Sequence, residues 1–362
     1  MFQVKRLCRR QFNLMLGFMS MMLLIGFSAC GHPPVIDGNS TTNPSSERDA
    51  IPTEFRIGYQ LTGGPETLAK GLKLMEKQFP DVSIRWLPFD SGPAVNEAFA
   101  AGNIDAGLVG SVPAATGIAQ ELPYQVYFLF NIIGDNQALV ATEESDIKSI
   151  ADLPGKTIGV PFGSTSHFSF LSALEQENIN PDDLQVLNLQ PQDLLSAWQL
   201  GEIDGGFVWQ PTLARMLDKE SSNVVVTARK LAEKGIITAD LGVVNKEFAA
   251  QYPDFINSYA EAINTAVKLY QEDPIAASEA MAPEVALSPE ETLTLMNELV
   301  WLNAEEQGSG KYMGTVDTPG ALSQVLKDSA DFLVDQGVLL SAPDVEAYQG
   351  ALYHQAIANV RN

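Results

Sequence analysis

The sequence contains very little cysteine and histidine. Its two cysteines are Cys8 and Cys30, and its three histidines are His32, His167 and His354. Both cysteines precede the folded part, so no intrachain disulfide is expected, and the scattered histidines have no metal-ligand spacing. We therefore expect no metal site and no cofactor, and the hydrophobic core must supply the stability of the fold.

Basic residues are scarce as well. The chain has 22 lysines and arginines against 45 aspartates and glutamates, a formal net charge of −23. Such a charge excludes nucleic acid as a partner, because the phosphate backbone would be repelled. It favours solubility, and we expect a monomer. It does not exclude a small anionic ligand, since backbone N–H groups at helix ends set the local potential of a pocket.

The N-terminal segment has the pattern of a secretory signal. Four basic residues precede an apolar run over residues 14–27, which is shorter than the roughly 20 residues of a membrane-spanning helix. We predict a signal over residues 1–29 and an exported protein.

The residue that follows this signal is a cysteine. Cys30 comes directly after Ser28 and Ala29, an arrangement that resembles the bacterial lipobox. This predicts a lipid on Cys30 that anchors the protein to the membrane, on the periplasmic or cell-surface side. Residues 30–52 are rich in Pro, Ser, Thr, Asn and Gly and predict a flexible tether, because they offer little apolar surface to bury.

An internal repeat defines the architecture. Residues 101–109 (AGNIDAGLV) and 200–208 (LGEIDGGFV) share the pattern GxIDxGxV. Each glycine follows a helix-like run and predicts a left-handed helix stop before a buried strand. The similarity extends upstream, where RIGY at residues 56–59 aligns with TIGV at residues 157–160. Each half therefore predicts alternating strands and helices, which form a parallel sheet with right-handed crossovers.

Two α/β lobes joined by two chain crossings follow from this repeat. We place the crossings near residues 137–142 and 240–245, with lobe one at residues 53–138 and 243–362 and lobe two at residues 139–242. The segment from residue 247 to the C-terminus predicts several helices, punctuated by prolines. Two crossings form a hinge, so closure of the lobes around a ligand is expected.

Ligands of such sheets bind beyond the carboxyl ends of the strands, where helix N-termini direct free N–H groups into the cleft. We therefore search the residues that follow the repeat strands. They are Tyr59, Gln60, Gly110, Ser111, residues 161–165 and residues 207–210.

Four stretches carry a family resemblance: WLPFDSG at residues 86–92, VPFGSTSH at 160–167, NLQP at 188–191 and AWQLGEIDGGFVWQP at 197–211. With them, the chain resembles the taurine-binding proteins of the periplasmic sulfonate and nitrate binding superfamily. The resemblance implies a bilobal (Venus flytrap, type II) fold, and the role of solute-binding component of an ABC importer with a permease and an ATPase as partners. It also implies taurine or a similar small sulfonate as ligand.

The chemistry of taurine assigns roles to the candidate residues. A sulfonate is an anion with three acceptor oxygens, which several N–H and O–H donors satisfy; Ser111, Ser164 and Thr165 are candidates, and the alternative for each is an N-cap. An ammonium group needs a carboxylate, and Asp240 aligns with the acid that the family places before its return strand. The alternatives for Asp240 are a helix cap or a hinge salt bridge.

The remaining candidates and departures concern the cavity wall. Trp209 would lie against the ligand's ethylene chain or contact its cation, or else pack between lobes, and Gln60 and Tyr59 are wall residues. The chain has Val112 where relatives often have serine and Gly242 where they often have tryptophan. Both departures favour a roomier pocket and a shift toward a longer aminosulfonate or an alkanesulfonate.

The competing function is an enzyme, because relatives of this superfamily in thiamine-precursor synthesis share the fold. Catalysis needs a nucleophile with a base, or an acid with a base. The cleft-facing positions offer Ser, Thr, Gln, Trp and one Asp, with no cysteine. We therefore expect no catalytic residue and a binding protein, with an alkanesulfonate, nitrate or a thiamine precursor as the alternative ligand.

Overall fold

The computed structural model describes residues 51–218 and 221–360. The predicted signal at residues 1–29, Cys30 and the tether up to residue 50 lie outside the described residues. No helix within the described ranges is long and apolar enough to cross a membrane.

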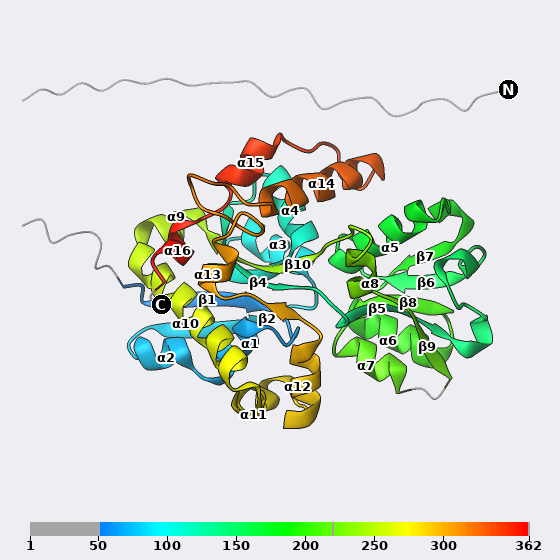
Figure 1. Cartoon of the computed structure of the whole chain (residues 1–362), viewed down its shortest axis with the longest axis horizontal. Helices are drawn as coiled ribbons and strands as arrows, with labels where there is room; N and C mark the ends of the chain where they lie inside the picture. Colours follow the sequence, from blue (N-terminus) through cyan, green and yellow to red (C-terminus); the bar gives the residue numbers. More distant parts are fainter. Residues whose placement is uncertain (1–50, 219–220, 361–362) are drawn as a thin grey trace, which may run out of the picture. The chain divides into compact units, whose positions relative to one another are not determined.

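The first sheet has six strands in the order β11-β4-β10-β3-β1-β2 (Figure 1). Its strands β1 to β3 are parallel, whereas β10 runs antiparallel to both β3 and β4. The bounds are β1 Glu54–Tyr59, β2 Ser83–Pro88, β3 Ala106–Gly110, β4 Tyr124–Ile132, β10 Ala239–Asn245 and β11 Val300–Trp301.

The second sheet, green in Figure 1, has five strands in the order β7-β6-β8-β5-β9. Strands β6, β7 and β8 are parallel, and β5 runs antiparallel to β8 and β9. The bounds are β5 Gln137–Thr142, β6 Thr157–Val160, β7 Gln185–Asn188, β8 Gly205–Trp209 and β9 Ser222–Thr227. We call the part around the first sheet lobe one and the part around the second sheet lobe two.

The internal repeat appears as the same structure in both lobes. Strands β2-β1-β3 of lobe one correspond to β7-β6-β8 of lobe two. The repeat aspartates also act alike, since the backbone N–H of Arg56 donates to Asp105 Oδ2 at 2.8 Å and that of Thr157 donates to Asp204 Oδ2 at 2.8 Å. The aspartate of the repeat therefore fastens the start of its third strand to the start of its first.

The glycines of the repeat end helices α3 (Gly92–Ala100) and α6 (Pro191–Leu200) as predicted. Gly102 and Gly201 have φ of 68° and 73°. This left-handed conformation disfavours residues with a Cβ, so glycine permits a sharp turn from helix into strand.

Two details of the predicted architecture differ from the structure. Both sheets are mixed rather than parallel, because the strands that follow the crossings, β5 and β10, pair antiparallel with β8 and β3. The crossings also lie earlier than the predicted boundaries, since β5 belongs wholly to the second sheet from Gln137 and β10 wholly to the first sheet from Ala239. The two crossing segments are therefore residues 133–136 and the residues between α8 (Ala228–Ala232) and β10.

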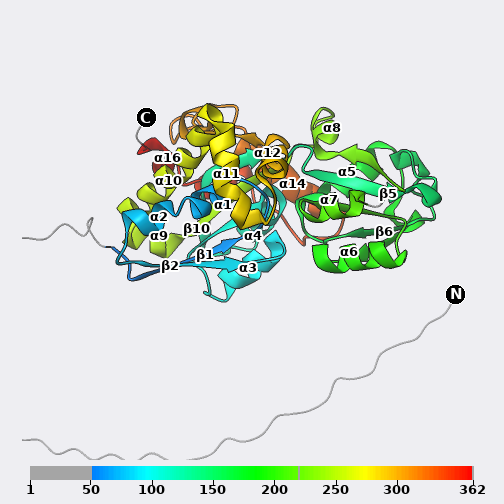
Figure 2. The ribbon, with the colours of Figure 1, turned by 90° about the horizontal axis from the view of Figure 1, so that it is seen from below.

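Helices cover both faces of the second sheet (Figure 2). Phe207 belongs to a core cluster with Phe170 and Leu174 of α5 (Thr165–Gln176), whereas its neighbour Val208 belongs to a cluster with Trp198 of α6. Successive strand residues point to opposite faces, so α5 and α6 cover opposite sides; α7 (Thr212–Leu217) shares the side of α6.

The remaining helices belong to lobe one. The helices predicted after residue 247 are confirmed, and prolines begin three of them: α10, α11 and α12. The bounds are α1 Pro65–Gly71, α2 Leu74–Gln78, α4 Ser111–Ala119, α9 Lys246–Gln251, α10 Pro253–Glu272, α11 Pro274–Val285, α12 Pro289–Asn297, α13 Ala304–Gln307, α14 Leu322–Asp335, α15 Val345–Gly350 and α16 Gln355–Ala358.

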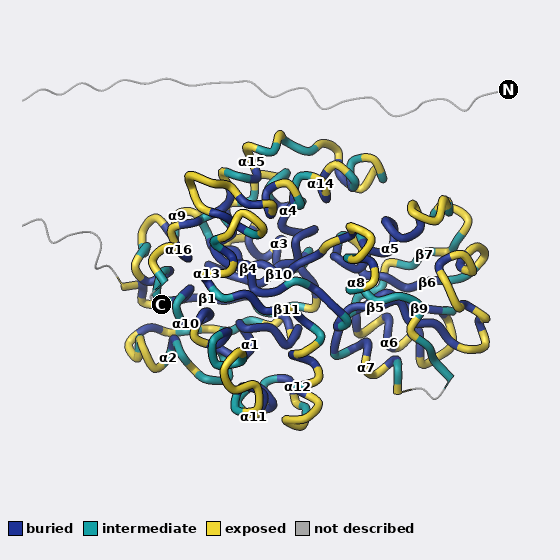
Figure 3. The backbone as a smooth tube through the Cα atoms, in the orientation of Figure 1, coloured by how far each residue is buried: buried dark blue, intermediate teal, exposed yellow. Residues whose placement is uncertain are grey.

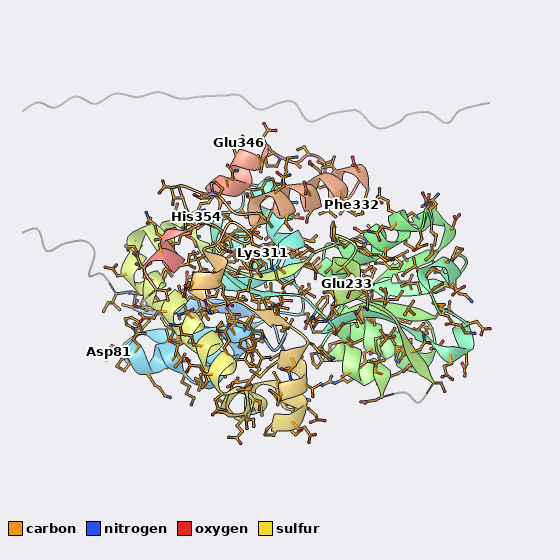
Figure 4. All side chains as sticks on the ribbon, viewed as in Figure 1. Asp81, Glu233, Lys311, Phe332, Glu346 and His354 are labelled. Atoms are coloured by element: carbon orange, nitrogen blue, oxygen red, sulfur yellow. The ribbon has the colours of Figure 1, made fainter. Side chains whose placement is uncertain are left out.

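Burial follows this layering. The central strands are dark blue in Figure 3, and exposed residues gather on the outer helices and loops. Helix α14 also contacts lobe two, where Phe332, labelled in Figure 4, lies edge-on to Phe168 of α5 with ring centroids 5.1 Å apart. The C-terminal part of lobe one therefore packs against lobe two.

Candidate functional site

A cavity lies where the two lobes meet the first crossing segment. The space between its wall atoms is about 350 Å³, part of it open to solvent. Its lining residues come from both lobes and from the first crossing segment: Gln60, Thr62, Gly92, Gly110, Pro113, Ile133, Asn136, Gln137, Ser164, Thr165, Trp209 and Asp240.

Six of the eight residues expected to bind ligand line this cavity, but Tyr59 and Ser111 do not. Tyr59 lies one residue before Gln60, and its ring packs edge-on to Trp86 at a centroid distance of 6.1 Å. The Ser111 hydroxyl is fully buried and accepts a hydrogen bond from the Ala239 N–H at 3.2 Å. Ser111 therefore fastens β10 to the start of α4.

Three helices begin at the cavity wall. Gly92 is the first residue of α3, Gly110 is the N-cap of α4, and Ser164 is the N-cap of α5. The first N–H groups of a helix have no intrahelical acceptor, and the helix dipole adds positive potential there. A Cβ on Gly110 would lie only 2.6 Å from Thr165 Cγ2, so this glycine permits the starts of α4 and α5 to approach across the lobes.

The hydroxyl hydrogens of Ser164 and Thr165 are bound within the protein. Ser164 Oγ donates to the Pro161 carbonyl at 2.6 Å and accepts from the His167 N–H at 3.2 Å, which makes it the N-cap of α5. Thr165 Oγ1 donates to Gln137 Oε1 at 2.9 Å. A ligand at this wall would therefore meet backbone N–H groups and the Gln137 amide rather than the two hydroxyl hydrogens.

Gln137 is a site residue that the sequence analysis missed. It is 1% exposed, and its Nε2 has no hydrogen-bond partner among the described residues. The Thr62 hydroxyl is also buried and lacks a partner there. Two features of the sequence could have indicated these residues. Gln137 is a polar residue at the start of the apolar strand β5, and Thr62 lies two residues after Gln60.

Asp240 is a buried carboxylate in the cavity wall. It is 5% exposed, and on β10 it lies opposite Gly110 of β3 and Asn131 of β4. Burial raises the pKa of Asp240 to about 7, and the contact with Asn131 opposes this rise. Its Oδ2 has no hydrogen-bond partner, and no lysine or arginine of the described chain forms an ion pair with it.

The departures at Val112 and Gly242 do not enlarge the cavity. Neither residue lines it. A Cβ on Gly242 would lie 2.6 Å from the Tyr127 ring and 2.7 Å from Phe130. These two rings occupy the space that a larger side chain at position 242 would need.

Among the residues that line the cavity, Asp240 is the one acid, and there is no cysteine or histidine. No group of three or more His, Cys, Asp or Glu side chains with ligand geometry occurs within residues 51–218 and 221–360. The polar groups of the wall are amides, hydroxyls and one carboxylate, a set suited to binding a small charged organic molecule.

Comparison with known proteins places this geometry in a family. The NMT1/THI5-like family model matches residues 88–277. The taurine-binding periplasmic protein of Escherichia coli K12 is 31% identical over 287 residues, which are 78% of this chain and 86% of that protein. The chain belongs to the NMT1/THI5-like family. It is a solute-binding protein of the periplasmic type and not an enzyme.

Other similar proteins differ in the ligands that their names record. A putative aliphatic sulfonates-binding protein of Escherichia coli K12 is 31% identical over 52% of this chain and 59% of its own length. The alkanesulfonate-binding protein SsuA of Xanthomonas axonopodis pv. citri, solved with bound MOPS, superposes with a TM-score of 0.68 at 23% identity. It covers 84% of this chain and 99% of its own. This structural similarity confirms the bilobal binding-protein fold.

Proposed function

We propose that this protein captures taurine, or an aminosulfonate close to it, and delivers it to the permease of an ABC importer. The observation that carries the proposal is one cavity that combines three helix N-termini with a buried carboxylate that has no cationic partner in the described chain. A zwitterion with a sulfonate and an amine supplies a negative group for the helix N-termini and a positive group for the carboxylate.

The helix starts and Gln137 suit the sulfonate. Its three oxygens accept several hydrogen bonds, and the starts of α3, α4 and α5 offer N–H donors without any cationic side chain in the cavity wall. Gln137 Nε2 adds a fixed donor, because Thr165 holds the other end of the same amide. An anion bound this way needs no arginine.

Asp240 suits the amine. A carboxylate held away from water is costly unless it is paired, and an ammonium group brings three donors and a positive charge. An alkanesulfonate without an amine would leave Asp240 unpaired. The names of the relatives support the sulfonate class, and Asp240 favours the aminosulfonate within it.

A thermal-shift screen tests this proposal. A ligand that binds only the folded protein raises its stability by RT ln(1 + [L]/Kd). Taurine and homotaurine should raise the Tm more than ethanesulfonate, nitrate or a thiamine precursor at equal concentration. A larger shift with ethanesulfonate would reassign the protein to alkanesulfonates, and a shift with nitrate or a thiamine precursor alone would reject the sulfonate class.

We further propose that Cys30 carries a lipid that holds the protein at the membrane beside its permease, as a monomer. The support is the sequence of residues 28–30 after an apolar signal-like run. Replacement Cys30→Ser should release the protein from membranes or block processing of the signal. Wild-type protein that is processed normally yet recovered entirely in the soluble fraction would reject the anchor.

A further inference from the structure

A second buried carboxyl, Glu66, lies on α1, which begins beside Asn131, the β4 neighbour of Asp240; a Cβ on its N-cap Gly64 would lie 3.0 Å from Asn131 Nδ2. Glu66 is in the first turn of α1 and is 1% exposed. Its Oε1 accepts a hydrogen bond from the Tyr259 hydroxyl of α10 at 2.9 Å, and its Oε2 is buried without a partner in the described residues. It does not line the cavity, so it can act on a ligand only through its neighbours.

No lysine or arginine of the described residues forms an ion pair with Glu66. Its helix carries Lys70 one turn later, but that lysine pairs with Glu284 of α11. The facing groups are Tyr259 of α10, Tyr127 of β4 and Asp240 of β10. Within the described residues, the two carboxyls therefore share a buried region with the tyrosine hydroxyls and the Asn131 amide, and both cannot be ionised there at low cost.

The two carboxyls differ in what each can contact. Asp240 lines the cavity, whereas Glu66 does not and is held by the Tyr259 hydroxyl. Burial raises the pKa of both groups, and the charge of Asp240 adds to the rise at Glu66. Asp240 is therefore the group that the ammonium of a ligand can ionise, and its charge then favours the protonated form of Glu66.

We propose that Glu66 is a positioning residue for the amine end of the ligand, which keeps its proton while Asp240 loses its own, so that capture of an aminosulfonate releases a single proton. This inference rests on the proposed function. Below about pH 7, Asp240 of the empty site is mainly a neutral acid; when the ligand's ammonium arrives, Asp240 becomes a carboxylate beside it and its proton passes to the buffer. Neutral Glu66 leaves one negative charge facing one positive charge.

Calorimetric titration counts the proton. Taurine is titrated into the full chain at pH 6 in buffers with different ionisation enthalpies, and the slope gives the protons released. We expect about one for the wild type, about one for Glu66→Gln and near zero for Asp240→Asn. Release of two protons by the wild type and one by Glu66→Gln would mean that Glu66 also ionises, and release of none would mean that neither does; both results overturn the proposal.

Affinity separates positioning from a general structural role. Replacement Glu66→Leu removes the acceptor of Tyr259 and should weaken taurine binding roughly tenfold, while Glu66→Gln, which keeps the shape and polarity, restores most of it. Ethanesulfonate, which lacks the amine, should change less than about threefold in both variants. Equal losses for the two ligands in Glu66→Leu would show that Glu66 only supports the fold.

A measurement without ligand keeps the two proposals distinguishable. The infrared band of protonated carboxyl groups should be present in the empty wild type at pH 6 and weaker in Glu66→Gln and in Asp240→Asn. Its absence from the wild type would overturn the acidic pair. If the band is present but ethanesulfonate binds as tightly as taurine, the aminosulfonate assignment fails, and with it the role of Glu66 in capture. If the wild type prefers taurine but Glu66→Leu weakens the binding of taurine and ethanesulfonate equally, only the proposed role of Glu66 is rejected.

Discussion

Thr165 Oγ1 of lobe two donates to Gln137 Oε1, 2.9 Å away at the crossing into that lobe. This bond fixes which end of the Gln137 amide faces the cavity, and it leaves the buried Nε2 as a donor for an anion. Replacement Gln137→Leu should therefore weaken binding of all sulfonates, with or without an amine, by roughly 1 to 3 kcal/mol.

The control for Gln137 is Thr165→Val, which keeps the size of the side chain and removes its hydroxyl. The amide can then rotate, so a smaller loss of affinity is expected, of the same sign. Calorimetric titration of both variants with taurine and ethanesulfonate measures these losses. A Gln137→Leu variant that binds both ligands as tightly as the wild type would exclude Gln137 from the sulfonate site.

Trp209 should report ligand binding. It is the last residue of β8, it pairs with Gln137 of β5, and it lines the cavity. Taurine should change the intrinsic fluorescence, and Trp209→Phe should lose most of that change. The other three tryptophans, Trp86, Trp198 and Trp301, do not line the cavity; an unchanged signal in Trp209→Phe would assign the response to one of them.

Gln210 connects the lobes beside the cavity. Its Nε2, in lobe two, donates at 3.1 Å to the carboxylate of Glu298, which follows α12 in lobe one. Burial raises the pKa of Glu298, and this bond opposes the rise. Replacement Gln210→Leu should weaken the contact between the lobes and speed ligand dissociation about tenfold, as expected for a lost hydrogen bond to a charged group.

Stopped-flow dissociation, followed by tryptophan fluorescence, measures the effect of Gln210→Leu. The matched variant Glu298→Gln keeps an acceptor for Gln210 and should dissociate ligand more slowly than Gln210→Leu. If neither variant alters the dissociation rate, the bond does not hold the lobes together.

The buried carboxyls make stability depend on pH. In the unfolded chain Asp240 and Glu66 ionise near the ordinary pKa values of their side chains, 3.8 and 4.5, whereas in the folded protein these pKa values rise to about 7 and about 8. The folded state binds more protons between these limits, so the free energy of unfolding of the empty protein should fall as pH rises from about 4 to about 8. Each group contributes at most about 5 kcal/mol to that fall.

Denaturant unfolding at a series of pH values checks this slope. Glu66→Gln and Asp240→Asn should each flatten part of it, because each removes one titrating group. A stability that is constant from pH 5 to pH 8 in the wild type would contradict the burial of two protonated carboxyls.

Local patterns in the sequence determine much of this fold. The repeat GxIDxGxV contains the glycine that stops each helix and the aspartate that fastens each strand, so the two α/β lobes follow from it, whereas the antiparallel pairing of β5 and β10 does not. The repeat does not determine which face of the sheet each side chain points to. Gln60 reaches the cavity, whereas Tyr59 packs against Trp86. The alternating direction of side chains separates such neighbours, and the choice of side depends on pairing with distant strands.

Contacts between distant segments explain the residues that were missed. Gln137 becomes a fixed donor only because Thr165, 28 residues later, approaches it. From the sequence, Glu66 is an acidic residue in the first turn of a helix, a position that is normally exposed. It is buried because α10 covers it with Tyr259, 193 residues away. Neither relationship leaves a pattern in the local sequence.

In the proposed site, Asp240 recognises the amine of the ligand. The variant Asp240→Asn tests this contact, because asparagine keeps the shape of the side chain and removes its charge. Calorimetric titration of wild type and variant with taurine and with ethanesulfonate at pH 8, where the wild-type carboxyl is ionised, compares the two ligands. Taurine should lose about 2 to 5 kcal/mol of binding free energy, the range for truncating a buried charge pair, while ethanesulfonate should bind equally well or better. Equal losses for both ligands would contradict the account and leave Asp240 as a structural residue.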